Sequence, residues 1–293
     1  MSDGPQYDVI IVGGGAAGLS AALYSVRAML KTLVLEKTAV GGEILKTGDI
    51  ENYPGFPEGI SGPDLAMLYE QQARKFGTEI KYDTVKLLDV EGPVKTIIGE
   101  QEQYTSKVVI IATGGEHNKL GVPGEENYAG RGGSYCATCD GALPMFRDQP
   151  LVVVGGGDSA CEEATYLTRF ASKVYLVHRR DELRASKIMA DRTFANDKIE
   201  PVWHSEVTEV LDVAQDKVTG VKIRNNQTNV ESTLDCAGLF IAIGHVPNTQ
   251  LFRGVIDMDD AGYILPQRGQ ATNVAGVFVA GDCSDHVYRQ AVT

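Results

Sequence analysis

The chain has 293 residues, of which 43% are hydrophobic and 23% charged, and its formal net charge at pH 7 is −12. This length allows one or two domains, each with a core of its own. The negative charge disfavours nucleic acid and anionic membranes as partners, although it can also serve solubility alone, and no apolar run approaches the roughly 18 residues that span a bilayer.

The cysteine pattern and the N-terminus indicate the compartment. The first residues lack the basic and then apolar pattern of a secretory signal. The five cysteines are not spaced as a disulfide framework. We therefore expect a reducing, cytoplasmic compartment, in which a Cys-x-x-Cys pair is either redox-active or metal-binding.

A dinucleotide-binding fingerprint opens the chain. An apolar strand is expected over 8–12, followed by the run Gly13-Gly14-Gly15-Ala16-Ala17-Gly18, an amphipathic helix and a second strand over 32–35. Glycines at such a turn let the backbone approach a pyrophosphate, which also meets the unpaired amides of the helix N-terminus. Glu36 ends the second strand, where a carboxylate can accept hydrogen bonds from both ribose hydroxyls. Such a carboxylate is typical of NAD and FAD sites, and by contrast with the second cradle described below, the first should hold the adenosine half of FAD.

The next segments fit a domain of the same kind. A helix is expected over about 62–76 and short antiparallel strands over about 85–106. Two further apolar strands, over 107–114 and 275–282, end in small residues. The second of them places Asp282 at its carboxyl end, where α/β sheets bind their ligands.

Cys136 and Cys139 form a candidate dithiol just before the first strand of the inserted domain described below. Asp140-Gly141 fits a turn or a helix start, where cysteines three residues apart are close enough to bridge. The dipole of a helix N-terminus would lower a thiol pKa and favour the reactive thiolate. Asp140 is placed to relay a proton as a general acid or base.

A structural zinc site is the main alternative for this pair. Such a site needs about four ligands, usually two pairs of cysteines. The other cysteines, Cys161, Cys236 and Cys283, are isolated in the sequence, and the histidines form no cluster with ligand spacing. We therefore expect no metal, and a redox role is favoured over zinc or an inert pair.

A second fingerprint repeats the first at an offset of 142 residues without a gap. It reads Gly155-Gly156-Gly157-Asp158-Ser159-Ala160 and lies between strands expected over 151–154 and 174–177. His178 corresponds to Glu36 and is followed by arginines at 179, 180 and 184. Guanidinium groups bind a ribose 2′-phosphate, which a carboxylate would repel, so this cradle should prefer NADPH. Alternatively, the three arginines form only a solvated basic face on a helix that Asp181 opens.

Two such repeats predict an α/β fold with two doubly wound, Rossmann-like dinucleotide-binding domains. Glycine- and proline-containing linkers near 114–124 and 244–248 set the boundaries. The FAD-binding domain is expected to be discontinuous, over 1–116 and 246–293. The NADPH-binding domain, over 117–245, is inserted into it and carries the Cys-x-x-Cys pair. This organisation predicts electron transfer from a nicotinamide through a flavin to a disulfide.

The motifs resemble those of low-molecular-weight, bacterial-type thioredoxin reductases over nearly the whole chain. The matching runs are the two fingerprints, Glu51-Asn52-Tyr53-Pro54-Gly55, Cys136-Ala137-Thr138-Cys139-Asp140, His178-Arg179-Arg180-Asp181 to Arg184, Gly244-His245-x-Pro247-Asn248-Thr249, and Gly281-Asp282 through Tyr288-Arg289-Gln290-Ala291. The resemblance implies an FAD-dependent homodimer that reduces the disulfide of thioredoxin with NADPH.

The resemblance and the fingerprints together imply the site residues. Cys139 would face the flavin, Cys136 would exchange with thioredoxin and Asp140 would act as the acid. The residues expected to contact FAD are Gly13, Gly15, Ala16, Ala17, Glu36, Gly42, Glu43, Asn52, Asp282, Gln290 and Ala291. The residues expected to contact NADPH are Gly155, Gly157, Asp158, Ser159, His178, Arg179, Arg180 and Arg184.

The chain departs from the family pattern at two places. Glu43 stands where the family usually has glutamine, and its charge would disfavour an anionic reduced flavin. The run from Tyr288 to Thr293 resembles the first turn of a helix that caps the flavin in this family. One isolated turn is not stable, so a protein that ends at Thr293 is expected to retain FAD weakly.

The domain organisation also predicts a motion. The dithiol and the NADPH site share one domain, yet hydride transfer needs reacting atoms roughly 3–3.5 Å apart. We therefore expect a rotation about Gly114-Gly115 and Gly244 that brings each in turn to the flavin. The sequence leaves three alternatives open: a reductase for another disulfide protein, a dithiol oxidase, and a redox sensor that does not turn over.

Overall fold

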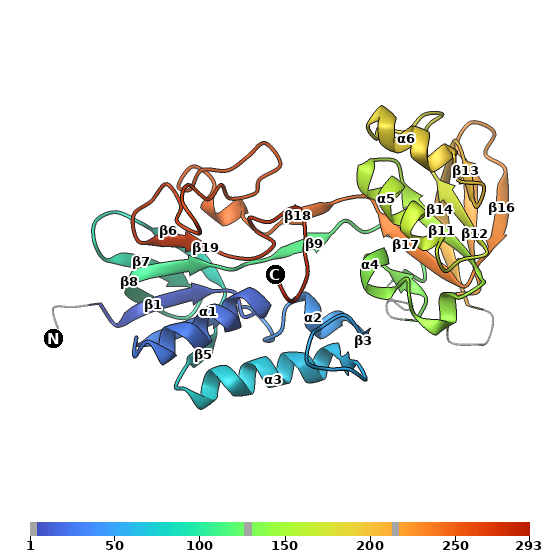
Figure 1. Cartoon of the computed structure of the whole chain (residues 1–293). Coiled ribbons are helices and arrows are strands. Elements are labelled where there is room, and N and C mark those ends of the chain that lie inside the picture. The colour runs from blue at the N-terminus through green and yellow to red at the C-terminus, as the bar shows by residue number, and fades with distance from the viewer. Residues whose placement is uncertain (1–4, 126–130, 213–216) are drawn as a thin grey trace. The chain divides into compact units, whose positions relative to one another are not determined.

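The structure, a computed structural model, describes residues 5–125, 131–212 and 217–293 (Figure 1). The chain divides into two compact units. The first unit consists of Met1–Glu116 together with Val246–Thr293, and the second unit is His117–His245. Each unit is built around its own sheet and has its own buried cores. Within the described residues no helix is long and apolar enough to cross a membrane.

The sheet of the first unit has the strand order β5-β2-β1-β8-β7-β6, and β19 pairs with the C-terminal part of β8, beyond the part that pairs with β7. The strands β5, β2, β1, β8 and β19 pair in parallel, whereas β6 and β7 extend the sheet in antiparallel fashion from β8. Their bounds are β1 Tyr7–Val12, β2 Thr32–Glu36, β5 Glu79–Tyr82, β6 Val85–Asp89, β7 Lys95–Gly99, β8 Gln103–Ile111 and β19 Val277–Val279.

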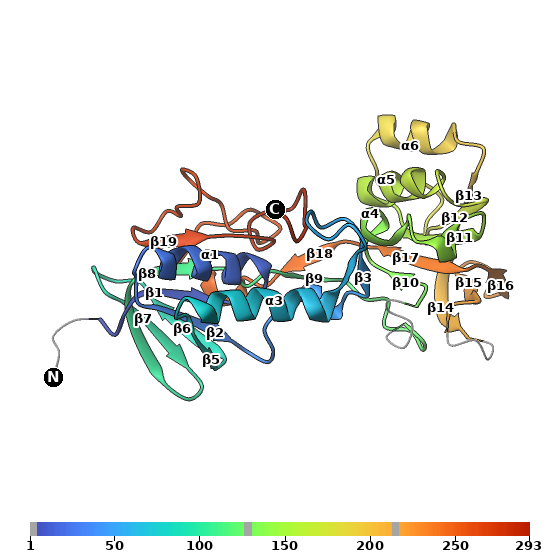
Figure 2. The same ribbon diagram turned by 60° about the horizontal axis from the view of Figure 1, so that its bottom comes forward.

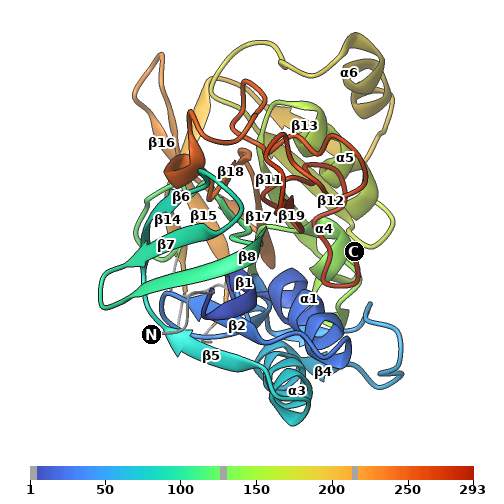
Figure 3. The same ribbon diagram turned by 90° about the vertical axis from the view of Figure 1, so that its left-hand side faces the viewer.

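Both faces of the central strand β1 are buried, which explains the unbroken apolar run over 9–12. Val9 and Ile11 pack with residues of α1 (Ala16–Arg27) and α3 (Gly62–Lys75). Ile10 and Val12 pack on the opposite face with apolar residues from the C-terminal part of the unit. Figures 2 and 3 show α1 and α3 lying together on one face of the sheet. The minor elements are α2 Glu43–Lys46, β3 Asp49–Ile50, β4 Ile60–Ser61 and η2 Gln250–Phe252.

The second unit contains a parallel sheet with the order β10-β17-β11-β12-β13. Apolar residues of α5 cover one face, and an antiparallel sheet β14-β15-β16 covers the other. The bounds are β10 Gly133–Ser134, α4 Ala137–Asp140, η1 Pro144–Phe146, β11 Pro150–Gly155, α5 Asp158–Leu167, β12 Lys173–Val177, α6 Lys187–Phe194, β13 Ile199–Val202, β14 Ser205–Leu211, β15 Gly220–Asn225, β16 Glu231–Asp235 and β17 Gly238–Ala242.

The two segments that join the units pair with each other. β9 (Gly115–His117) and β18 (His245–Pro247) form a two-stranded sheet. Gly114 and Gly244 precede these strands and have φ values of 65° and 100°. Such left-handed conformations favour glycine, which explains why glycine stands at both positions.

Two local expectations from the sequence are wrong. No helix begins at Asp181, because the amides of Arg184 and Ala185 donate to the carbonyl oxygen of Gly156 at 2.6 and 3.1 Å and hold the segment as a loop up to α6. A short strand, β10, precedes the two cysteines, so they do not lie before the first strand of their sheet. Residues 288–293 contain a turn and no helix, in keeping with the low stability of one isolated helical turn; the amide of Thr293 donates to the carbonyl oxygen of Gln290.

Candidate active site

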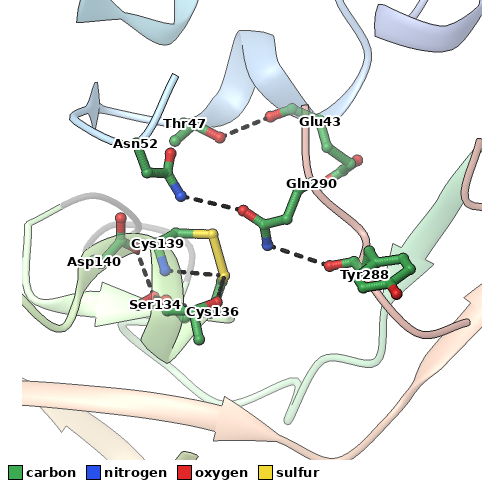
Figure 4. The surroundings of a disulfide bond; sticks show 10 residues. Glu43, Thr47, Asn52, Ser134, Cys136, Cys139, Asp140, Tyr288 and Gln290 are labelled. Atoms are coloured by element: carbon green, nitrogen blue, oxygen red, sulfur yellow. Dashed lines mark hydrogen bonds between the residues drawn. A yellow bond between two sulfur atoms is a disulfide. The ribbon is translucent and has the colours of Figure 1, made fainter. Parts of the chain in front are cut away.

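Cys136 and Cys139 form a disulfide, with their Cα atoms 5.3 Å apart (Figure 4). Cys136 caps the N-terminus of the short helix α4, which carries Cys139 one turn later. The amide of Cys139 donates to Sγ of Cys136 at 3.2 Å, and the hydroxyl of Thr138 lies 3.4 Å from the same sulfur. A thiolate formed at Cys136 would therefore meet two hydrogen-bond donors, which favour the charged form.

Asp140 is the acidic group beside this disulfide. Burial raises the pKa of its carboxyl, and the hydroxyl of Ser134, which donates to Oδ2 at 2.6 Å, partly opposes that effect (Figure 4). The same Ser134 oxygen accepts the amide of Cys136 at 3.0 Å. Ser134 thus connects the carboxyl to the backbone of the exchanging cysteine. No spacing pattern in the sequence points to this serine, because it lies on a different element, β10.

The remaining cysteines are packed in the cores. Cys161, Cys236 and Cys283 are free and buried. Burial raises the pKa of all three thiols, to about 12 for Cys236 and about 11 for Cys283, so they are poor thiolates. Within the described residues no group of three or more histidine, cysteine, aspartate or glutamate side chains could hold a metal ion.

The first glycine turn forms an open cradle at the start of α1. Gly15 is the N-cap of α1, and no side chain caps the helix, so its first amides face outward. Gly13 has a φ of 107°, and a Cβ there would lie 2.3 Å from the carbonyl oxygen of Ala112. The carboxylate of Glu36 accepts the amide of Gly14 at 2.8 Å and is thereby held beside the turn. This set of groups suits a pyrophosphate next to a ribose.

Other residues expected at this cradle come from both parts of the first unit. Gly41 bridges to Gly15, so the Gly41-Gly42 turn lies beside the start of α1. A Cβ on Gly281 would lie 2.8 Å from the Cβ of Ala17, which places Gly281-Asp282 against the same helix turn. Asp282 has a pKa raised by burial and by the charges of Asp285 and Glu43, with Arg289 acting in the opposite direction.

The C-terminal segment is joined to the loop that follows β3. The side-chain amide of Asn52 donates to Oε1 of Gln290 at 3.1 Å (Figure 4). Ala291 packs with a small apolar cluster that also includes Ala16 and Tyr53. Glu43 is the first residue of α2 and pairs with Lys46 at 2.7 Å. The residues expected to hold FAD are therefore gathered around the start of α1, although they are up to about 275 positions apart in the chain.

The second glycine turn forms the corresponding cradle at the start of α5. Gly157 is the N-cap of α5, again without a side-chain cap, and a Cβ on it would meet no atom within 4 Å. Asp158 accepts the amide and the hydroxyl of Ser186 at 2.7 and 3.0 Å, and Ser159 is exposed in the first turn. His178 is buried directly beneath Gly156.

Three cations surround this second cradle. Arg179, Arg180 and Arg184 are exposed, and no ion pair joins any of them to a carboxylate in the part of the chain that the structure describes. Their neighbour His178 stands where the first cradle has a carboxylate. Exposed guanidinium groups without acidic partners suit a phosphate monoester.

Comparisons with known proteins agree with this arrangement. The family model described as pyridine nucleotide-disulphide oxidoreductase matches residues 7–293. The chain is 51% identical over 288 residues to a protein of Mycolicibacterium smegmatis named thioredoxin reductase, and the match covers 98% of this chain and 91% of that protein. The crystal structure of thioredoxin reductase from Streptococcus pyogenes is 46% identical, has a TM-score of 0.93, and matches over 98% of this chain and 92% of that one. Thioredoxin reductase from Giardia duodenalis has a TM-score of 0.92 at 42% identity, over 98% of this chain and 93% of that chain.

Proposed function

Because the chain belongs to the pyridine nucleotide-disulphide oxidoreductases and, within them, to the thioredoxin reductases, we propose that it reduces the disulfide of thioredoxin with NADPH, through FAD and the Cys136–Cys139 pair. The family implies the use of a flavin and of NAD(P)H. The observation that carries the proposal is the Cys136–Cys139 disulfide beside the buried carboxyl of Asp140, in a chain with two nucleotide cradles.

The chemistry at the disulfide is an exchange of thiols. FAD, when bound, would supply two electrons taken from NADPH, and these electrons with two protons would convert the Cys136–Cys139 disulfide to a dithiol. The thiolate of Cys136 then attacks the disulfide of thioredoxin and forms a mixed disulfide, and Asp140 protonates the leaving sulfur. Attack by Cys139 on Cys136 restores the enzyme disulfide and releases thioredoxin as a dithiol. The amide of Cys139 and the hydroxyl of Thr138 support the assignment of Cys136 as the exchanging thiolate.

The two cradles divide the nucleotides between them. In the first, Glu36 would hold the ribose of FAD while the amides after Gly15 meet the pyrophosphate. Asn52, Asp282 and Gln290 would bind the rest of the flavin nucleotide, as the family resemblance implies. In the second cradle, the amides of α5 would hold the pyrophosphate of NADPH. The 2′-phosphate would meet the guanidinium groups of Arg179, Arg180 and Arg184 together with His178.

Electron transfer between the units requires both the dithiol and the nicotinamide to reach one flavin. We propose that rotation about the two linkers, with Gly114 and Gly244 as hinges, alternates them. A cross-link that locks one arrangement should block turnover and leave one half-reaction intact, whereas full turnover of the locked enzyme would refute the motion. The homodimeric state and the cytoplasmic location are further proposals, and light scattering after gel filtration tests the first.

An anaerobic titration tests the function itself. NADPH should bleach the oxidised flavin, and thioredoxin disulfide should restore its colour. Cys139→Ser and Cys136→Ser should still be bleached by NADPH but should not reduce thioredoxin, while Cys161→Ser, which alters a buried core thiol, should retain thioredoxin reduction. Full activity with serine at 136 or 139 would overturn the proposal. Recovery of the colour by oxygen rather than by thioredoxin would indicate a dithiol oxidase.

A further inference from the structure

His178 is fixed in place at the second cradle. Its side chain is only 6% exposed, and a Cβ on Gly156 would lie 2.2 Å from its Cε1 and 2.3 Å from its Nδ1. The indole of Trp203, which follows β13, packs edge-on against the imidazole, with ring centroids 6.3 Å apart. The imidazole is therefore confined between the glycine turn and the indole, and its direction is set before any ligand arrives.

One ring nitrogen of His178 makes no hydrogen bond in the part of the chain that the structure describes. Its Nε2 is buried and has no hydrogen-bond partner within residues 5–125, 131–212 and 217–293. An unsatisfied buried polar atom destabilises the folded protein. Beside it lies the start of α5, which no side chain caps and whose N-cap Gly157 borders open space. Together, the orphaned nitrogen and the uncapped helix indicate a site for an external anion.

The charges around His178 oppose its protonation in the free protein. Burial lowers the pKa of the imidazole, and the positive charges of Arg184 and Arg180 on the adjoining loop lower it further. Hydrogen bonding to the backbone of Gly155 and Glu182 acts in the opposite direction and raises this pKa. From α5, the carboxylate of Asp158 is engaged by Ser186. From the end of β13, Trp203 contributes no charge and His204 is the other titratable group. The ring is thus neutral near pH 7.

We propose that His178 takes up one proton from solvent when the 2′-phosphate of NADPH or NADP⁺ binds, so that the preference over the nucleotide lacking this phosphate increases as the pH falls. The step rests on the proposed nucleotide site and involves no electron transfer: neutral imidazole and a proton give imidazolium. The phosphate dianion offsets the repulsion between the imidazolium and the guanidinium groups of Arg180 and Arg184, and it attracts the imidazolium itself. The imidazolium can then donate from both ring nitrogens, which satisfies the orphaned one. Trp203 acts as a positioning residue in this step.

Calorimetry of nucleotide binding tests the inference. NADP⁺ and NAD⁺ are titrated separately into the flavin-containing enzyme, in buffers that differ in ionisation enthalpy, so that the number of protons taken up is measured without turnover. The experiment is run at about pH 7.5, where a phosphate monoester with a second pKa near 6 is already dianionic. NADP⁺ should take up at least about 0.5 proton per nucleotide and NAD⁺ almost none. Between about pH 7 and pH 8.5 the Kd for NADP⁺ should rise at least about threefold.

Two variants assign the proton to one residue. His178→Gln should bind NADP⁺ more weakly and without proton uptake. His204→Asn is the matched control, since it removes the neighbouring histidine at a left-handed position (φ 52°) that asparagine readily adopts, and it should keep the uptake. Absence of uptake by the wild-type enzyme, persistence in His178→Gln or loss in His204→Asn would overturn the inference. If NADP⁺ binds no tighter than NAD⁺ at any pH, the proposed NADPH specificity fails as well. If NADP⁺ binds more tightly but without proton uptake, only the inference about His178 fails. The wild-type comparison decides the question even if His178→Gln does not fold.

Discussion

Substitution of Gly18 by alanine should force α1 away from the strand before it. Gly18 is buried in the first turn of α1, and a Cβ there would lie 1.9 Å from the carbonyl oxygen of Gly13. Real Cβ atoms essentially never come within 3.0 Å of such a neighbour, so the two backbones must separate by at least about 1.1 Å. Both contacting groups are backbone-attached, so no side-chain rotation can relieve the overlap.

The expected loss of stability follows from two opposing terms. Overpacking of a tight core costs about 3 kcal/mol at its upper range, and replacement of glycine by alanine within a helix returns about 1 kcal/mol. The net loss is about 2 kcal/mol, or roughly 30-fold in the unfolding equilibrium constant of the first unit. In the second fingerprint the corresponding residue is Ala160, which is buried without exposure, so that unit already accommodates the methyl group.

The chain offers separate probes for the two units. Under the proposed assignment of FAD, flavin release reports on the first unit, and Trp203, the single tryptophan of the chain, reports on the second. In urea unfolding, Gly18→Ala should lower the midpoint of flavin release and leave the transition of Trp203 fluorescence unchanged. Ala160→Gly is the reciprocal control, and its loss of about 1 kcal/mol should appear in the Trp203 transition. A midpoint of flavin release for Gly18→Ala equal to that of wild type would refute the steric reasoning.

Three further predictions concern charged groups. Because the folded pKa of Asp140 is raised, this carboxyl stabilises the protein below its unfolded pKa of about 3.9 and opposes folding as the pH rises past that value. Asp140→Asn should therefore be more stable than wild type to urea at pH 7 but reduce thioredoxin about 100-fold more slowly, and an unchanged kcat would exclude it as the acid. Arg184→Ala should raise the KM for NADPH about 10- to 100-fold without altering that for NADH, and an equal effect on both would place it away from the 2′-phosphate. Glu43→Gln should make the flavin midpoint potential more positive by on the order of 10–20 mV, since Glu43 is half-exposed and paired with Lys46; spectroelectrochemistry measures this, and a negative shift contradicts it.

The strands and the glycine turns could be predicted from the sequence because burial on two faces demands a distinctive pattern. β1 and β11 each lie between two covered faces, so the runs over 9–12 and 151–154 are apolar without alternation. Each is followed by a glycine turn, which the close approach of backbone to helix requires. These signals are local, and they appear twice at the same offset, so both could be identified without any knowledge of contacts between distant residues.

The loop after β12 could not be predicted in this way. Asp181 and the residues after it have the composition of a helix start, but the amides of Arg184 and Ala185 donate to Gly156, which is 28 residues away from Arg184 in the sequence. Such a tertiary hydrogen bond overrides local propensity. Ser134 and Trp203 were missed for a related reason. Ser134 contacts Asp140, and Trp203 contacts His178, in each case from a different element. The sequence spacing within each pair matches no helix or strand period, so only the folded sheet brings the two residues together.

The repeat explains how one backbone frame can serve two nucleotides. Glu36 and His178 occupy equivalent positions, at or directly after the end of the second strand and beside the glycine turn. The carboxylate of Glu36 receives three backbone amides, from Gly14, Lys37 and Thr38, so its charge is compensated by the protein, and it can still accept from ribose hydroxyls. The imidazole of His178 instead lies among cations, and its Nε2 has no hydrogen-bond partner among the described residues. The positive charge of the second cradle is therefore compensated only when an anion binds. Under the proposed assignment, the choice between FAD and NADPH thus depends on the charge at this position and on the arginines that follow it in the second cradle, and exchange of the glycine turns alone should not exchange the nucleotides.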